Sequence, residues 1–408
     1  MFNISISYMN NRIFTQTDTP AVRLLDQLLD EAKSWRASDI HIEPLEKAWR
    51  VRLRIDGQLH EIIRPAVHLR EALINRIKVL AKLDISERRI PQDGRLKLID
   101  NQGNNAEFRV NTLPTLFGEK VVLRRLDTLP AELNLLILGY SAQQAELINA
   151  ALRSPTGMIL VTGPTGSGKT LSLFCFLQIL NTEALNICTV EDPAEIRLPG
   201  LNQVNVHEKA GLDFATTLKS FLRQDPDIIM VGEIRDFATA DVALKAAQTG
   251  HRVLSTLHTN DAPSTLIRLL DIGIAPFRLA AGIRMITAQR LIRCLCESCK
   301  LPVTLSTSAL HAAGYTSAKE NETWQAYSAS GCAACYGIGY HKRVGIHQLL
   351  PITPAIQEQI VARVSGASLT QLARAAGMPT LRQLALNKVK EGITSLEEAM
   401  MATEINEF

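Results

Sequence analysis

One eight-residue segment, Gly163–Thr170, constrains the fold of this chain more than any other part of the sequence. It runs Gly-Pro-Thr-Gly-Ser-Gly-Lys-Thr and matches the phosphate-binding loop pattern G-x-x-x-x-G-K-[ST] at every defined position. The apolar run Met158–Val161 precedes it and a helical pattern follows it. We therefore expect a buried strand, the loop and a helix in that order, within a mostly parallel α/β sheet covered by helices on both faces.

The residue types of this loop suit the binding of phosphate groups. Glycines let backbone N–H groups close around phosphate oxygens, and the following helix adds a partial positive charge at its amino end. Lys169 would neutralise charge on the β- and γ-phosphates of ATP, and the hydroxyl of Thr170 would ligate Mg²⁺. The expected nucleotide contacts are Gly163, Pro164, Thr165, Gly166, Ser167, Gly168, Lys169 and Thr170. The alternative is a loop that binds nucleotide without hydrolysing it.

Carboxylates end two later segments. Thr189–Glu195 follows an apolar run, and a glutamate here could orient an attacking water, although a solvated loop is the alternative. Asp227–Glu233 has four apolar residues that lead to an acidic tip, which resembles a Walker B strand. Gly232 occupies the usual aspartate position, so the acid is Glu233, one residue later. A carboxylate there can still act on Mg²⁺ through water.

Two histidines flank a further predicted strand, Gly250–His258. His258 would lie at the carboxyl end of the sheet, where ligands bind in open α/β folds, and could sense the γ-phosphate. His251 begins the same segment. A structural role is the alternative for both histidines.

The cysteines predict a metal site. Two Cys-x-x-Cys pairs offer four thiolates, which suit tetrahedral Zn²⁺ in a closed structural site. The ligands of this candidate site are Cys296, Cys299, Cys332 and Cys335. Four free thiols are the alternative, and Cys294 is a fifth candidate with a less suitable spacing. Cys175 and Cys188 fall in apolar runs and are expected in the core.

At 408 residues the chain is long enough for about two or three domains. In Trp49–Ile55 apolar residues alternate with arginines, and Asp56-Gly57 then predicts a hairpin turn. A helix over His68–Leu83 and strands over Glu107–Asn111 and Lys120–Leu126 complete a small α+β domain. The predicted division is a short tail over 1–18, the α+β domain over 19–130 and an α/β domain over 131–408, which includes a cysteine element over 290–345 and a helical region over 351–408.

Composition excludes some classes of protein. The net charge is +3 and only 5% of residues are aromatic, so a basic, aromatic nucleic-acid groove is not expected. No stretch approaches the roughly 18–20 uncharged apolar residues of a membrane span, and the first residues do not resemble a signal peptide. We therefore expect a cytoplasmic protein, and cysteines that act as thiols or metal ligands agree with this.

Several motifs together resemble one family. They are the loop 163–170, Glu191-Asp192-Pro193, Leu222–Asp227, Gly232–Asp236 and Thr256–Asn260, preceded by Ala37–Pro44, Arg54–Gly57, Pro91–Arg95 and Thr112–Pro114 and followed by Gln289–Arg293. In this order they resemble the secretion ATPase superfamily, and within it the GspE/PulE/PilB (HofB-like) group of type II secretion and type IV pilus assembly ATPases. The resemblance covers about Thr19 to Thr403, and the cysteine element favours this branch over retraction motors.

The resemblance implies a fold and a motor activity. A RecA-like P-loop ATPase domain would follow a small α+β, PAS-like domain. The chain would form a ring hexamer that hydrolyses ATP to power pilin or pseudopilin assembly. It would lie in the cytoplasm, held peripherally at the inner membrane by the platform proteins of the pilus or secretion system. The expected cofactors are ATP, Mg²⁺ and structural Zn²⁺, and direct binding of nucleic acid is not expected.

The resemblance also implies roles for single residues. Glu233 and either Glu191 or Glu195 would polarise water, and His251 and His258 would form the histidine box. Arginines of the first domain would offset charge in the loose phosphoryl-transfer transition state. The arginines that match best are Arg109 and Arg124, with Arg95 a further candidate.

Two features depart from the family pattern. Lys219 stands where the family usually has arginine, so a planar bidentate contact is lost if that side chain meets phosphate. About 18 residues precede the α+β domain, so the N-terminal docking domain of the group is expected to be absent, either truly or through a truncated start. A nucleotide-binding scaffold or degenerate paralogue with little motor activity is therefore the alternative function, and a nucleic-acid translocase is a third.

Overall fold

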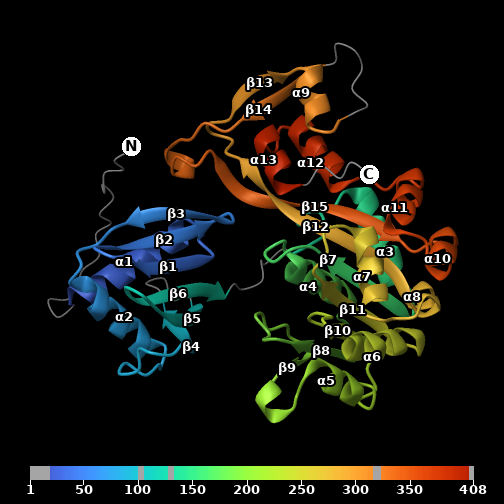
Figure 1. Ribbon diagram of the computed structural model, residues 1–408, viewed down its shortest axis with the longest axis horizontal. Helices are drawn as coiled ribbons and strands as arrows, with labels where there is room; N and C mark the ends of the chain where they lie inside the picture. Colours follow the sequence, from blue (N-terminus) through green and yellow to red (C-terminus); the bar gives the residue numbers. More distant parts are fainter. Residues whose placement is uncertain (1–18, 100–104, 127–132, 316–322, 404–408) are drawn as a thin grey trace. The chain divides into compact units, whose positions relative to one another are not determined.

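The computed structural model describes residues 19–99, 105–126, 133–315 and 323–403. The chain divides into two compact units, Met1–Thr128 and Leu129–Phe408, and each is described by itself (Figure 1). The predicted tail over 1–18 and the predicted boundary near Pro130 lie outside the described residues. In the described ranges no helix is long and apolar enough to cross a membrane.

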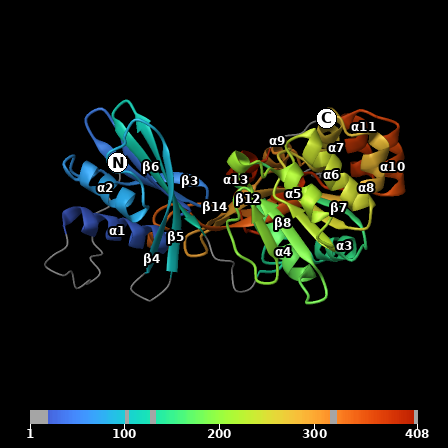
Figure 2. The same ribbon diagram turned by 90° about the horizontal axis from the view of Figure 1, so that it is seen from below.

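The first unit is a six-stranded sheet in the order β3-β2-β1-β6-β5-β4, with antiparallel neighbours throughout. Two helices, α1 and α2, lie on one face of this sheet (Figure 2). The elements are α1 (Pro20–Ser34), β1 (Asp39–Pro44), β2 (Trp49–Ile55), β3 (Gln58–Ile63), α2 (Leu69–Leu80), β4 (Gln92–Ile99), β5 (Asn105–Thr115) and β6 (Gly118–Leu126). The expected helix and strands of this α+β unit are confirmed.

Strand β2 shows how the sequence pattern selects a face. Trp49, Val51, Leu53 and Ile55 are buried, while the arginines between them are partly exposed. Successive side chains of a strand point to opposite faces, so the apolar set packs beneath the helices and the arginines face away. The other face of this sheet is therefore charged.

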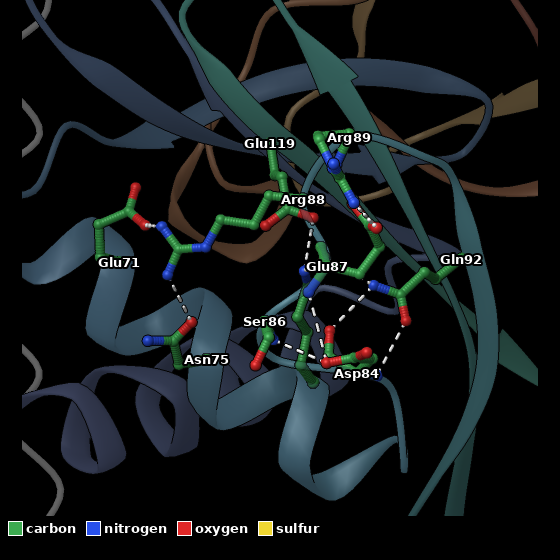
Figure 3. A network of polar contacts seen from close by, with 10 residues as sticks. Glu71, Asn75, Asp84, Ser86, Glu87, Arg88, Arg89, Gln92 and Glu119 are labelled. Atoms are coloured by element: carbon green, nitrogen blue, oxygen red, sulfur yellow. Dashed lines mark hydrogen bonds and ion pairs between the residues drawn. The ribbon is translucent and has the colours of Figure 1, made fainter.

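A polar network fixes the loop between α2 and β4 (Figure 3). Lys78 is fully buried, and its Nζ lies 2.6 Å from Oε1 of Glu119 on β6 and donates to the backbone oxygen of Glu87 at 2.7 Å. Arg88 pairs with Glu71 of α2, and the side chain of Gln92 donates to the backbone oxygens of Asp84 and Glu87. A buried charge needs such partners, so the loop is tied to both the helix and the sheet.

The second unit contains a seven-stranded sheet in the order β15-β12-β7-β11-β10-β8-β9. All neighbours are parallel except β15, which runs antiparallel to β12. The strands are β7 (Gly157–Thr162), β8 (Ile187–Glu191), β9 (Asn202–Asn205), β10 (Ile228–Val231), β11 (Arg252–Leu257), β12 (Ile283–Leu295) and β15 (Tyr340–Pro351). This is the mostly parallel α/β sheet that the sequence predicts.

Helices cover both faces of this sheet (Figure 2). One core contains Ile159 and Val161 of β7 together with residues of α3 and α4, whereas the other contains Met158 and Leu160 with residues of α6, α7, α8, α10 and α11. The helices are α3 (Ala142–Leu152), α4 (Lys169–Leu180), α5 (Phe214–Phe221), α6 (Phe237–Gln248), α7 (Ala262–Asp271), α8 (Pro276–Gly282), α10 (Pro354–Val361) and α11 (Gly366–Ala375). Cys175 and Cys188 belong to these cores, as expected.

A smaller layer extends β12 and β15 beyond the main sheet. It contains β13 (Leu301–Leu305), α9 (Thr307–Ala312), β14 (Trp324–Ser328), α12 (Leu381–Lys390) and α13 (Leu396–Ala402). Arg293 of β12 and Glu398 of α13 form a buried ion pair at 2.5 Å, which ties the last helix to the sheet. The region after Pro351 is helical, as predicted.

Candidate active site and metal centre

The candidate active site follows from the direction of the strands. β7, β8, β10 and β11 are parallel neighbours, so their carboxyl ends lie at one edge of the sheet. The phosphate-binding loop leaves β7, Glu191 ends β8, Glu233 follows β10 and His258 follows β11. Groups that are up to about one hundred residues apart in the sequence are thereby brought to a common edge.

The loop joins β7 to α4 with Gly168 as the helix N-cap. A Cβ on Gly163 would lie 2.5 Å from the backbone oxygen of Gln289, so only glycine fits there. The Nζ of Lys169 donates to the backbone oxygens of Gly163 at 2.9 Å and Pro164 at 3.0 Å. The ammonium group is thus held against the loop whose N–H groups would receive phosphate.

The pKa of Lys169 reflects its partly buried position. The pKa of Lys169 is lowered to about 8, mainly by burial; the negative charge of Glu233 opposes this shift, and the positive charge of Arg290 adds to it. A buried cation loses hydration, and a neighbouring anion restores part of the loss. The shift therefore also indicates that the charges of Lys169 and Glu233 interact.

Glu233 connects the other charged groups of the site. Its Oε2 lies 3.3 Å from Nε2 of His258, and its Oε1 pairs with Arg235. The side chain of His258 is half exposed, whereas that of Glu233 is 19% exposed. The turn that carries Glu233 is fixed by Thr256, whose hydroxyl donates to the backbone oxygen of Gly232 at 2.7 Å. The structure therefore brings Lys169, Glu233 and His258 together.

The two glutamates of the segment Glu191–Glu195 differ in environment. Glu191 is buried and accepts hydrogen bonds from the hydroxyl of Thr189 at 2.7 Å and from Nε2 of Gln203 at 3.0 Å. Burial raises the pKa of Glu191, and these two hydrogen bonds oppose the shift. Glu195 is exposed. Glu191 is thus held within the sheet layer, whereas Glu195 faces solvent.

The two histidines of the predicted box lie at opposite ends of β11. His251 directly precedes the strand. The Nδ1 of its ring lies 3.1 Å from the backbone oxygen of Ala246, and the backbone oxygen of His251 accepts a hydrogen bond from the N–H of Gly157 at the start of β7. A six-residue strand spans about 20 Å. The second unit therefore brings His258 to the loop and leaves His251 at the other edge of the sheet.

The four predicted zinc ligands converge at one point. Their sulfur atoms all lie within 4.8 Å of one another, with Cys296–Cys332 at 3.9 Å and Cys299–Cys335 at 3.8 Å. A tetrahedral Zn²⁺ with Zn–S bonds of about 2.3 Å has S···S edges of about 3.8 Å. A disulfide would require about 2.05 Å, so the four sulfurs fit a metal rather than a bridge.

Backbone N–H groups support this cluster. Gly331 donates to the sulfur of Cys299 at 3.3 Å, and Cys332 and Gly339 both donate to the sulfur of Cys335 at 3.2 Å. Such bonds orient ligands around a metal and favour the thiolate form. The cluster is therefore compatible with zinc in both its distances and its surroundings.

Comparison with known proteins agrees with this geometry. Residues 15–401 match the model of the family "Type II/IV secretion system protein". The chain belongs to this family. The predicted resemblance is therefore confirmed.

Relatives within the type II/IV secretion system family are closely similar. The chain is 50% identical over 387 residues to the type IV pilus assembly ATPase PilB of Pseudomonas aeruginosa, which covers 95% of this chain and 68% of the relative. It is 43% identical over 390 residues to the type II secretion system ATPase E of Vibrio cholerae, with 96% and 76% covered. The protein transport protein HofB homolog of Escherichia coli is 46% identical over 379 residues, with 93% and 80% covered.

Solved structures show the same fold. The pilus retraction motor PilT with bound ADP is 28% identical and covers 94% of this chain and 97% of its own, with a TM-score of 0.62. The ATPase DotB of Legionella pneumophila, at 22% identity, shares the fold over 95% of this chain and 96% of its own with a TM-score of 0.67. The predicted α/β ATPase fold is thus confirmed.

The candidate arginines form a row in the first unit. Arg95, Arg109 and Arg124 are direct cross-strand partners on β4, β5 and β6, so they share one face of the sheet. Arg124 pairs with Asp39 at 2.8 Å, Arg109 with Asp93 at 3.5 Å and Arg95 with Glu107 at 3.8 Å. About half of each arginine side chain is exposed. The row thus presents three guanidinium groups on the face opposite the helices.

Sequence reasoning missed three residues of these clusters. Asp39 extends the arginine row, because it is the cross-strand partner of both Arg124 and Arg54. Arg235 pairs with Glu233, and Gln289 of β12 contacts the phosphate-binding loop. All three lie in motifs that carry the family resemblance: Asp39 in Ala37–Pro44, Arg235 in Gly232–Asp236 and Gln289 in Gln289–Arg293. Membership in these motifs indicated that the residues matter, but it did not indicate which groups they contact.

Proposed function

We propose that this chain is a motor ATPase that hydrolyses ATP to power pilin or pseudopilin assembly in a type IV pilus or type II secretion system. The observation that carries the proposal is the meeting of Lys169, Glu233 and His258 at a complete phosphate-binding loop. Membership of the type II/IV secretion system family supports it, as do relatives that are pilus assembly and secretion ATPases.

Each residue of the site has a proposed role. The loop N–H groups and Lys169 bind the β- and γ-phosphates, and Thr170 holds Mg²⁺, which offsets phosphate charge when bound. Glu233 orients the attacking water and accepts its proton, while the half-exposed His258, 3.3 Å from Glu233, senses the γ-phosphate. The phosphoryl-transfer transition state is loose, so catalysis depends mainly on the positioning of the phosphates and the attacking water and on the neutralisation of negative charge.

The remaining predicted residues divide by environment. We assign a second water-positioning role to Glu195, because the hydrogen bonds of Glu191 to Thr189 and Gln203 hold it in place. The guanidinium groups of Arg95, Arg109 and Arg124 offset charge that develops on the phosphoryl group, as the family resemblance implies. The distance of His251 from the loop argues for a role outside the chemical step.

We further propose that the tetracysteine cluster holds structural Zn²⁺. Sulfur distances near the edges of a zinc–thiolate tetrahedron support this assignment. Four sulfur ligands leave no open position, so the metal would stabilise the fold rather than take part in hydrolysis.

The assembled state is also part of the proposal. We expect a homo-oligomer, a ring hexamer, that is recruited to the cytoplasmic side of the inner membrane by platform proteins. The ring and the platform partners follow from the family resemblance, and relatives named as a pilus assembly ATPase and a type II secretion system ATPase support a role in such a system.

The first test is ATP hydrolysis against protein concentration, with mass followed by light scattering. Turnover that rises as the oligomer forms is expected. Glu233→Gln should retain Mg–ATP binding and lose about 10²–10⁴-fold in turnover, because a group that handles the proton is removed. Glu195→Gln is the matched comparison and should lose less. Nucleotide binding without turnover at any concentration would instead support a nucleotide-binding scaffold.

A further inference from the structure

A buried glutamine holds the phosphate-binding loop from the neighbouring strand. Gln289 lies on β12, next to β7 in the sheet, and is 1% exposed. Its Nε2 donates to the backbone oxygen of Ser167 at 2.6 Å, and its Oε1 accepts from the hydroxyl of Ser172 at 2.8 Å. The Ser167 oxygen can only accept, so this contact fixes which end of the amide faces the loop.

This contact sets the direction of one peptide plane. In a trans peptide the C=O and the following N–H point in opposite directions, so a Ser167 oxygen turned toward β12 turns the N–H of Gly168 away from it. Gly168 has φ +87°, a conformation that glycine adopts readily, and glycine also permits the flipped peptide. Without a partner for the oxygen, this N–H would be free to turn out of the loop.

The glutamine is itself held by a chain of buried groups. Ser172 lies on α4, and its hydroxyl accepts from that of Tyr140 at 3.3 Å. The ring of Tyr140 stacks on His347 of β15, with centroids 3.5 Å apart, and Nε2 of His347 lies 3.0 Å from the backbone oxygen of Leu138. This chain links the loop to the segment 133–140 at the start of the second unit.

We propose that Gln289 is a positioning residue for nucleotide phosphates. It directs the N–H of Gly168 toward the phosphates of a bound nucleoside di- or triphosphate, and Ser172 and Tyr140 hold the amide in place. This inference rests on the proposed nucleotide-binding function and assigns a residue outside the loop motif to it.

The test compares two buried glutamines of the same sheet. Gln289→Leu removes both hydrogen bonds at similar volume. Gln348→Leu is the control, because Gln348 is also buried, accepts from the N–H of Ala262 at 2.9 Å and donates to the backbone oxygen of Pro379 at 3.1 Å, away from the loop. Both variants lose buried hydrogen bonds and should melt at lower temperature. A difference in nucleotide affinity between them is therefore not explained by loss of stability alone.

Only Gln289→Leu should weaken the binding of phosphate groups. We expect the Kd for Mg–ADP and the KM for ATP to rise about tenfold, and kcat to change by less than about threefold, since one N–H contact to phosphate and its support are lost. Inorganic pyrophosphate should lose the same factor as a competitor, because it carries only the phosphates. Ser172→Ala and Tyr140→Phe should give smaller losses of about threefold.

Separate outcomes decide the inference and the proposed function. Wild-type affinity for Mg–ADP in Gln289→Leu, or an equal loss in Gln348→Leu, would overturn the positioning role. A wild-type protein that binds Mg–ADP without hydrolysing ATP would refute the motor, while the comparison of Kd values would still decide the role of Gln289. A wild-type protein without affinity for Mg–ADP would overturn both.

Discussion

The pH dependence of nucleotide binding should follow the charge of Lys169. Burial lowers the pKa of this group to about 8 in the nucleotide-free protein, with Glu233 acting in the opposite direction. Bound phosphates would raise the pKa, since opposite charge at close range favours the protonated form. At pH 7, one unit below this pKa, Lys169 is mostly protonated before and after binding. Above pH 8 binding requires proton uptake, so affinity falls as pH rises.

The size of the effect follows from this pKa. At pH 9, one unit above a pKa of about 8, only about one tenth of the free protein carries a protonated Lys169. The Kd for Mg–ADP should then be about tenfold higher than at pH 7, which corresponds to about 1.4 kcal/mol. The increase should continue at up to about tenfold per pH unit until the pKa of the bound state is reached.

Isothermal titration calorimetry with Mg–ADP between pH 7 and 9.5 measures this directly. In that range the second ionisation of a phosphate, with a pKa of about 6, is complete, so the ligand charge is constant. Lys169→Arg keeps its charge throughout and should give a constant Kd. Glu233→Gln should start its loss of affinity at lower pH, because Glu233 raises the pKa of Lys169. A constant wild-type Kd up to pH 9.5, or an equal fall in Lys169→Arg, would refute the reasoning.

Two further predictions concern the outer layer of the second unit. Cys299→Ser should remove bound zinc, which elemental analysis measures. It should also increase amide hydrogen exchange around the four cysteines while exchange in β7 and α4 stays slow. Cys294→Ser is the control, and zinc retained by Cys299→Ser would contradict the metal site. Glu398→Leu should lower the free energy of unfolding by about 3–5 kcal/mol, because it leaves the buried guanidinium of Arg293 without its partner. The double variant Arg293→Met/Glu398→Leu should regain most of that loss in urea denaturation, and an additive loss would show that the two groups do not interact.

Local patterns were sufficient where neighbours in sequence determine the structure. The alternation in Trp49–Ile55, the loop 163–170 and the acidic tip at Glu233 each depend on a few consecutive residues. Parallel strands then place their carboxyl ends at one edge, so the position of His258 followed from the fold class. The two Cys-x-x-Cys pairs likewise predicted a cluster that the structure brings together.

Long-range pairing was beyond these patterns. β12 and β15 were not predicted as strands, although β12 pairs with β7 on one side and with β15 on the other. Their partners lie tens to more than one hundred residues away along the chain, and their mixed polar and apolar sequence gives no clear period. The separation of His251 from His258 and the burial of Glu191 also depend on strand length and on Gln203, which no motif marks.

These long-range contacts change the explanation of the loop itself. The phosphate-binding motif explains glycine at 163 and 168 by the close approach of phosphate. In this structure, however, the atom nearest to an added Cβ belongs to Gln289 at both positions. Its backbone oxygen lies 2.5 Å from a Cβ on Gly163, and its Nε2 lies 3.2 Å from a Cβ on Gly168. Strand β12 therefore requires the same small residues that the ligand requires. β12 contacts the loop whether or not nucleotide is bound, so the loop already has its shape when nucleotide arrives. The conformational entropy of the loop is therefore lost during folding and does not reduce the affinity for nucleotide.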